Sequence, residues 1–159
     1  MTDIRLRNAE PADCHAIHGL IGELADFEQL RHQVVVTPQD LARHLFADRP
    51  LVECIVAVDD ERVVGFALFF PNFSTFLGKP GLYLEDLYVQ PSHRGTGIGT
   101  RMLVHLAQLA VARGYGRFEW SVLDWNRNAI AFYEKMGATV MPDWRICRVT
   151  GDALTALAR

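Results

Sequence analysis

A glycine-rich turn between an apolar run and a helical pattern constrains this chain more than any other feature. The apolar run covers residues 82–89, the turn reads Q-P-S-H-R-G-T-G-I-G-T over residues 90–100, and a helical pattern follows as far as Arg113. Glycine has no side chain and tolerates positive φ, so these glycines let the main chain approach a ligand closely. The first turn of a helix has unpaired N–H donors and a partial positive charge. The strand, the turn and the helix start together therefore predict a binding site for phosphate. We call residues 94–100 the cradle.

Two common phosphate-binding motifs do not fit this turn. A Walker A loop needs Lys and then Ser or Thr after its last glycine, whereas Thr100 and Arg101 follow Gly99. A dinucleotide fingerprint needs glycine or alanine at position 100 and opens the first βαβ unit of a domain. The segment R-G-T-G-I-G is instead similar to the R-x-x-G-x-G pattern of the GNAT N-acetyltransferases, which hold the pyrophosphate of acetyl-CoA on these amides. A plain glycine-rich turn is the alternative interpretation of the motif alone.

Length and composition predict one domain covering residues 1–159. Half of the residues are hydrophobic, 22% are charged, and the net charge is −3 without a basic cluster, so nucleic acid is not an expected partner. We expect no membrane contact, because no apolar run approaches the roughly 20 residues of a span. Cys14, Cys54 and Cys147 lack metal-ligand spacing, and His15 and His18 lack a carboxylate partner, so we expect no metal. Reduced thiols and the absence of a signal peptide pattern predict a cytoplasmic protein.

Hydrophobic periodicity and cap residues predict an α/β (α+β) fold, in which helices flank a mixed central β-sheet. One predicted helix begins at Thr37-Pro38 by cap chemistry, and another is capped by Asn126 and ends before Gly137. Residues 71–81 are predicted as a loop because they contain two prolines and two glycines. The predicted strands are 4–7, 53–58, 62–70, 82–89, 118–123 and 145–149, and the other predicted helices are 11–27, 98–113 and 152–157.

Two acids interrupt the apolar run that precedes the cradle. Glu85 and Asp86 stand side by side and break strict alternation, a pattern typical of a β-bulge, which re-aims side chains and frees main-chain donors. Glu85 is a candidate base that attracts a cationic amine and takes its proton, either directly or through water. The N–H of Val89 or a neighbour is a candidate donor to a carbonyl oxygen on which charge develops. A solvated strand end is the alternative interpretation of the acids.

Tyr133 lies in A-I-A-F-Y-E-K-M-G, on the helix capped by Asn126. An aromatic residue on an amphipathic helix is commonly a half-buried packing residue. The functional interpretation is a phenol that donates its proton to a leaving thiolate. The sequence alone leaves both interpretations open.

Over nearly its full length the chain resembles the spermidine/spermine N1-acetyltransferase branch of the GNAT superfamily. The shared landmarks are R-N-A-E-P-A-D-C, E-L-A-D-F-E, Q-V, V-V-G-F-A, Y-L-E-D-L-Y-V, R-G-T-G-I-G, D-W-N and A-F-Y-E-K-M-G-A. The combination of Y-L-E-D-x-Y-V, R-G-x-G-I-G and L-D-W-N is most similar to the sub-branch that contains thialysine Nε-acetyltransferase.

This resemblance implies an acetyl-CoA-dependent N-acetyltransferase, typically a homodimer, acting on a small-molecule amine. It implies Tyr133 as general acid, and Phe27, Glu28, Glu85 and Asp86 as contacts of the amine. The residues implied in acetyl-CoA binding are Leu87, Tyr88, Val89, Arg94, Gly95, Thr96, Gly97, Ile98, Gly99, Thr100, Asn126, Arg127, Asn128, Ala129 and Tyr133.

Departures from the family pattern fall on substrate recognition. Arg31, His32 and Ser74 stand where the polyamine enzymes tend to carry acids, Phe76 replaces the usual tryptophan, and the segment around 142–143 is shortened. Fewer carboxylates attract a polycation less strongly. We therefore expect acetyl transfer to a primary amine of an amino-acid-like or di/polyamine substrate, by direct attack in a ternary complex. A protein lysine or N-terminal acetyltransferase and a non-catalytic CoA-binding module are the alternatives.

Overall fold

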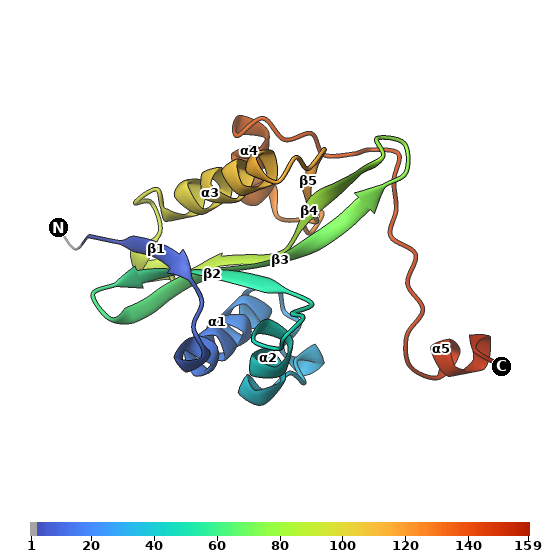
Figure 1. The fold of residues 1–159 in the computed structure, drawn as a ribbon, viewed down its shortest axis with the longest axis horizontal. Coiled ribbons are helices and arrows are strands. Elements are labelled where there is room, and N and C mark those ends of the chain that lie inside the picture. Colours follow the sequence, from blue (N-terminus) through green and yellow to red (C-terminus); the bar gives the residue numbers. More distant parts are fainter. Residues whose placement is uncertain (1–2) are drawn as a thin grey trace. The chain divides into compact units, whose positions relative to one another are not determined.

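The computed structural model describes residues 3–159, and its centre is a mixed five-stranded β-sheet (Figure 1). The strands lie in the order β1-β2-β3-β4-β5. Neighbours from β1 to β4 are antiparallel, whereas β4 and β5 are parallel, which confirms the predicted mixed sheet. The strands are β1 Arg5–Asn8, β2 Glu53–Asp59, β3 Arg62–Ser74, β4 Lys79–Val89 and β5 Phe118–Trp120.

Helices cover both faces of this sheet. In Figure 1, α1 and α2 lie on one face and α3 lies on the opposite face. The chain divides into two compact units, one ending at Ser121 and one beginning at Val122, and α4 and α5 belong to the second. The helices are η1 Pro11–Asp13, α1 Cys14–Phe27, η2 Arg31–Gln33, α2 Pro38–Leu45, η3 Pro91–His93, α3 Ile98–Ala112, α4 Arg127–Lys135 and α5 Gly151–Leu157.

Local cap chemistry sets two of these helix starts, as the sequence predicts. The Thr37 hydroxyl accepts a hydrogen bond from the Asp40 N–H at 3.1 Å, and the Asp40 carboxylate accepts one from the Thr37 N–H at 2.9 Å. This capping box satisfies two otherwise unpaired donors, and Pro38 suits the first helical position because it has no N–H to lose. Asn126 caps α4 through one such bond, its side-chain oxygen accepting from the N–H of Ala129 at 3.3 Å.

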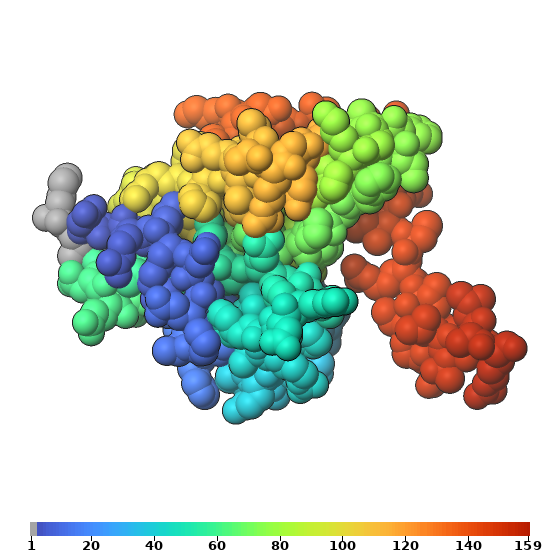
Figure 2. All heavy atoms as spheres, in the orientation of Figure 1, coloured from blue at the N-terminus to red at the C-terminus, as the bar shows by residue number. Residues whose placement is uncertain are grey.

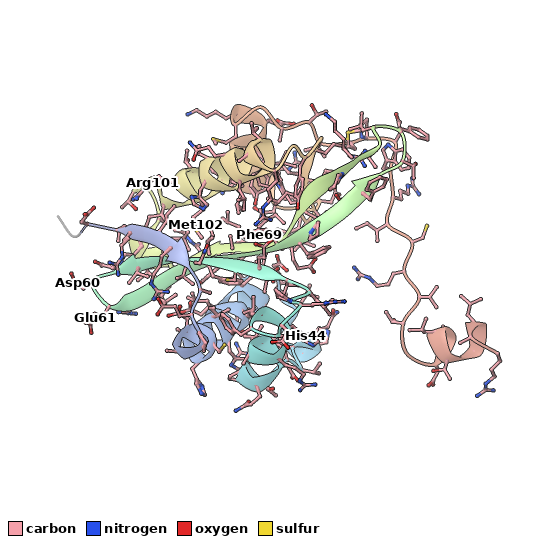
Figure 3. The ribbon with its side chains drawn as sticks, in the orientation of Figure 1. His44, Asp60, Glu61, Phe69, Arg101 and Met102 are labelled. Atoms are coloured by element: carbon pink, nitrogen blue, oxygen red, sulfur yellow. The ribbon has the colours of Figure 1, made fainter. Side chains whose placement is uncertain are left out.

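Apolar side chains fill both layers between helices and sheet. On the α3 side, where α3 packs on β4 and β2, Met102 and Leu106 are fully buried, and Figure 3 labels Met102 on α3 and the buried Phe69 in the sheet. Each such side chain contributes roughly 1.5–3 kcal/mol when it is fully buried. On the α1 and α2 side, the buried cluster consists of Cys14, Ile17, Leu20, Leu41, Leu45, Cys54, Val56, Val58, Val63, Phe66, Leu68 and Tyr88.

The predicted loop at 71–81 is wrong, because β3 and β4 continue through it as a long hairpin. Pro71 pairs with Leu82 and Phe73 pairs with Pro80, and only residues 75–78 form the turn. Proline is tolerated where a strand has a free edge. The last β3 residue that pairs with β2 is Phe69, so Pro71 lies beyond the ladder that its missing N–H would weaken.

The predicted strand at 145–149 is also wrong, since residues 144–150 form neither helix nor strand. Trp144 and Ile146 alternate with charged residues but are 76% and 70% exposed. A strand exists only with a partner that completes its hydrogen bonds, and alternation alone supplies none. The strand predicted at 118–123 is likewise shorter, ending at Trp120. Among residues 3–159 no helix is long and apolar enough to cross a membrane.

Candidate functional site

The cradle is an open turn that leads into an uncapped helix. Gly95 and Gly97 have φ values of 76° and 83°, and a side chain built at either would meet no other atom within 4 Å. Gly97 is the N-cap of α3, yet no side chain in the described structure hydrogen-bonds to that cap. The first N–H groups of α3 therefore face outward as donors with the partial positive charge of the helix. This geometry fits the pyrophosphate of a nucleotide cofactor.

Arg94 connects the cradle with the end of α1. Its Nε donates to the carbonyl oxygen of Val89 at 2.8 Å. Its guanidinium carbon lies 5.2 Å from the ring centroid of Tyr88 and 5.9 Å from that of Phe27, both within cation–π range. Phe27, an amine contact implied by the family pattern, is therefore linked to the cradle by one side chain.

The sheet opens beside the last residues of β4. Strand β5 pairs only with Leu82, Tyr83 and Leu84, so the following residues of β4 have β3 as their only strand partner within residues 3–159. The N–H of Gln90 donates to Val64 on the β3 side at 2.9 Å. Because N–H groups alternate sides along a strand, the N–H of Val89 points to the unpaired edge. A main-chain donor is thus available where the sequence predicts an oxyanion donor.

The predicted β-bulge at Glu85 is present. Leu68 pairs with Asp86 while the next residue, Phe69, pairs with Leu84, so Glu85 is the extra residue on β4. The bulge leaves Glu85 exposed in a strand that is buried on either side of it. The local disruption re-aims this carboxylate away from the ladder, beside the strand that leads to the cradle.

Three carboxylates gather at this bulge. Burial, together with the nearby negative charges of Glu85 and Glu28, raises the pKa of Asp86 to about 6. Burial also raises the pKa of Glu28, which follows directly after α1. Concentrated negative charge of this kind attracts a cation such as a substrate ammonium. The structure therefore brings together the three acids that the sequence assigns to the amine.

The remaining predicted residues lie on or next to α4, in the unit that begins at Val122. They are Asn126, Arg127, Asn128, Ala129 and Tyr133. Tyr133 is half-buried, and its ring centroid lies 5.5 Å from that of Phe132. The roles of these residues in cofactor binding and proton donation stay predictions.

One set of polar residues is not predicted from the sequence. The hydroxyl groups of Tyr83 and Ser121 lie 2.9 Å apart, Asn72 Nδ2 donates to Glu119 at 3.4 Å, and Arg117 Nε lies 3.2 Å from the same carboxylate oxygen. We call these five residues the distal polar cluster. Its sequence signal is the period-two series Arg117, Glu119, Ser121, which places polar groups on one face of β5. Within residues 3–159, no group of three or more His, Cys, Asp or Glu residues is arranged to hold a metal ion.

The sequence of the chain is similar to those of known proteins. Residues 22–138 match the acetyltransferase (GNAT) family, and the chain belongs to that family. It is 38% identical to the L-ornithine N5-acetyltransferase of Arabidopsis thaliana, an alignment that covers 96% of this chain and 87% of the relative. It is 37% identical to the thialysine N-epsilon-acetyltransferase of Mus musculus over 99% of both chains. The spermidine/spermine branch that the motifs indicate is thereby confirmed.

Solved structures agree on the fold. An integron cassette protein from the mobile metagenome of V. cholerae superposes with a TM-score of 0.82 at 28% identity, covering 100% of this chain and 99% of that protein. An aminoglycoside acetyltransferase from an uncultured soil sample superposes with a TM-score of 0.76 at 17% identity, covering 92% of this chain and 95% of the other. At that identity the second likeness concerns the fold alone.

Proposed function

We propose that the protein transfers the acetyl group of acetyl-CoA to a primary amine of a small amino-acid-like or di/polyamine substrate. The observation that carries this proposal is that a single strand, β4, bears an acidic bulge at Glu85 and leads, after Val89, into the uncapped start of α3. One strand thus joins a site for a cationic amine to a site for a phosphate-bearing cosubstrate. We further propose that both compact units form one acetyltransferase domain, because the family match at 22–138 spans the division at Ser121.

The residues present fit the cosubstrate. The outward N–H groups of residues 95–100 would hold the pyrophosphate, and the unpaired edge of β4 at Leu87, Tyr88 and Val89 would align the pantetheine arm. Asn126, Arg127, Asn128 and Ala129 complete the proposed binding surface by family pattern. Acetyl-CoA, when bound, supplies a thioester whose carbonyl carbon is open to attack by an amine.

Proton movement is assigned to two side chains. Glu85 accepts the proton of the substrate ammonium through water, since the bulge presents its carboxylate in an exposed position. The N–H of Val89 donates a hydrogen bond to the carbonyl oxygen as a C–N bond forms and the C–S bond breaks. The hydroxyl of Tyr133 then gives its proton to the leaving thiolate, while the attacking nitrogen loses its extra proton to water and water re-protonates the phenolate. The proposed transfer is direct: the amine attacks the thioester in a ternary complex, and no side chain forms a covalent bond with the acetyl group.

Substrate preference follows from the charges around α1. Arg31 forms an ion pair with Asp26 at 2.9 Å, so one acid near the end of α1 is offset by a cation. Fewer net negative charges around the end of α1 weaken the attraction of a tetra-amine such as spermine. We therefore propose that a short diamine or diamino acid is preferred over spermine. We propose that thialysine, lysine, ornithine, putrescine and spermidine span the relevant range.

We also propose that the protein acts as a homodimer. The end of the β3–β4 hairpin exposes apolar side chains, with Phe73 of β3 61% exposed and Phe76 of the turn fully exposed. Exposed apolar side chains of this kind favour a protein contact surface. Light scattering that gives the mass of a single chain at micromolar concentration would contradict this proposal.

The test is release of free thiol from acetyl-CoA with each of these amines. We expect release with at least one of them, at a rate that rises with pH because only neutral amine attacks. Binding of acetyl-CoA without thiol release by any amine would instead support a CoA-binding module. Release only with lysine-containing or free N-terminal peptides would support a protein acetyltransferase.

A further inference from the structure

We propose that His93, paired with Asp59, is a positioning residue that holds the cradle in the conformation that binds the pyrophosphate of acetyl-CoA. The inference rests on the proposed function, and it adds to the cosubstrate site two residues that belong to neither the cradle nor the bulge. His93 is the last residue of η3 and directly precedes Arg94, where the cradle begins. Asp59 is the last residue of β2.

The imidazole ring of His93 is held at both of its nitrogen atoms. Nε2 lies 3.0 Å from Asp59 Oδ2, and Nδ1 lies 2.8 Å from the hydroxyl oxygen of Ser92. A carboxylate only accepts hydrogen bonds, so Nε2 donates to Asp59, whereas the Ser92 hydroxyl can either donate to Nδ1 or accept from it. The side chains of His93 and Asp59 are only 19% and 20% exposed, so water competes weakly for their contact. These two hydrogen bonds fix the orientation of the ring.

Asp59 belongs to a well-paired part of the sheet. Strand β2 lies between β1 and β3, and Asp59 itself pairs with Arg62 of β3. Its second carboxylate oxygen, Oδ1, is buried and has no hydrogen-bond partner among the residues that the structure describes. A carboxylate with so little water around it interacts more strongly with the donor that it has, which is His93. In Figures 1 and 2 the β2–β3 turn (green) lies beside β1 (blue), at the end of the sheet where α3 begins.

The main chain of His93 connects this pair to the cradle. Thr96 Oγ1 donates to the carbonyl oxygen of His93 at 2.6 Å. Gly95 and Gly97, on either side of Thr96, adopt φ values of 76° and 83°, and glycine loses more conformational freedom on ordering than any other residue. An anchored His93 therefore fixes the one cradle residue that lies between two flexible ones. The pyrophosphate then meets N–H groups that are already oriented, which lowers the entropy cost of binding.

A second set of contacts lies at the other end of η3. Gln90, the residue before η3, accepts from Arg62 Nη2 at 3.2 Å through its Oε1. Its Nε2 donates to the Glu23 carboxylate at 3.3 Å. These bonds tie the start of the segment to β3 and α1, where it leaves β4. His93 fixes the end of the segment that enters the cradle, so we assign the positioning role to His93.

The test compares acetyl-CoA with S-acetylpantetheine, which has the thioester and the pantetheine arm but lacks the pyrophosphate. We expect His93→Ala to raise the KM and the calorimetric Kd of acetyl-CoA about tenfold, because a binding-competent conformation that falls to about a tenth of the population raises the apparent Kd by that factor. The kcat/KM for S-acetylpantetheine should stay within about twofold of wild type, and so should kcat with saturating acetyl-CoA. A general loss of structure would lower the activity with both thioesters alike.

Three further variants sharpen this comparison. His93→Gln should restore most of the lost affinity, because its amide nitrogen stands as many bonds from Cβ as Nε2 does and still donates to Asp59. Asp59→Ala should match His93→Ala, and the double variant should bind no more weakly than either, since both changes remove one interaction. His18→Ala is the matched control. His18 Nε2 lies 2.9 Å from the carbonyl oxygen of Val36, and His18 belongs to neither the cradle nor the bulge, so acetyl-CoA affinity should stay as in wild type.

Calorimetry with CoA separates this inference from the proposed reaction. If no amine releases thiol, the proposed transfer fails, whereas CoA binding that weakens in His93→Ala and recovers in His93→Gln still supports the positioning role. If His93→Ala does not fold, Asp59→Ala provides the same comparison. Unchanged CoA affinity in the folded variant, or an equal loss for acetyl-CoA and S-acetylpantetheine, overturns the inference even if acetyl transfer occurs.

Discussion

The cradle and the acidic bulge lie close together in the chain, but the cradle presents main-chain groups whereas the bulge presents side chains. The cradle is main chain, with glycines at positive φ and open space where side chains would be. The bulge presents side chains, and the half-buried Asp86 has a pKa raised to about 6 by burial and by its acidic neighbours. A backbone site recognises a group that every family member shares, whereas a side-chain site changes with one substitution. We therefore expect cosubstrate affinity and amine preference to vary independently.

We expect the largest effect from Tyr133, which belongs to neither the cradle nor the bulge. Tyr133→Phe keeps the ring and removes the hydroxyl. If the phenol protonates the leaving thiolate, kcat falls by roughly 10²–10⁴ with acetyl-CoA affinity retained. A structural hydrogen bond alone would cost about 0.5–1.5 kcal/mol of unfolding free energy and leave turnover nearly intact. Steady-state kinetics and thermal unfolding of the same variant distinguish these outcomes.

Glu85→Gln should separate the two regions directly. Loss of the base lowers kcat/KM for the best amine by about 10²-fold, while the dissociation constant of acetyl-CoA stays within about twofold. Glu61→Gln is a suitable control, because Glu61 is an exposed acid in the β2–β3 turn, labelled in Figure 3, and is not part of the bulge. A parallel loss of acetyl-CoA affinity in Glu85→Gln would contradict the independence of the two regions.

Gly97→Val tests the contribution of the cradle to acetyl-CoA binding. The side chain would obstruct the ligand and strain a residue at φ 83°, so we expect acetyl-CoA to bind about tenfold or more weakly. Gly114→Val is the matched control, since Gly114 has φ 72° and equally open surroundings at the far end of α3. Isothermal calorimetry that finds equal affinities in the two variants would remove the cradle from the cofactor site.

The smallest expected effect concerns Asp86 and depends on pH. Its folded pKa of about 6 lies above the ordinary aspartate pKa of 3.8, so the folded state binds more protons between these values and stability falls as pH rises through them. Asp86→Asn should therefore raise the unfolding free energy by on the order of 1–2 kcal/mol at pH 7, and the gain should vanish below about pH 4. The same variant should lose amine affinity. Denaturant titrations at both pH values check the sign, and a destabilised variant at pH 7 would refute it.

Features decided by neighbouring residues are predictable from the sequence. The capping box at Thr37, the asparagine cap at Asn126 and the glycine turn of the cradle each follow from donors, acceptors or φ values within a few residues. The bulge at Glu85 is also foreseen, because adjacent acids cannot both follow an alternating apolar pattern. Local chemistry thus determined the cradle, the bulge and the helix starts.

Features decided by strand pairing needed the tertiary structure. Pro71 and Pro80 indicate a loop, yet they lie in paired strands because β3 has a free edge beyond Phe69. Residues 145–149 are predicted as a strand, yet within residues 3–159 no strand pairs with them. The distal polar cluster joins Asn72, Tyr83 and Glu119 from three strands, and no sequence period relates them. Hydrogen-bond partners distant in sequence are chosen by register, and register is a property of the folded sheet.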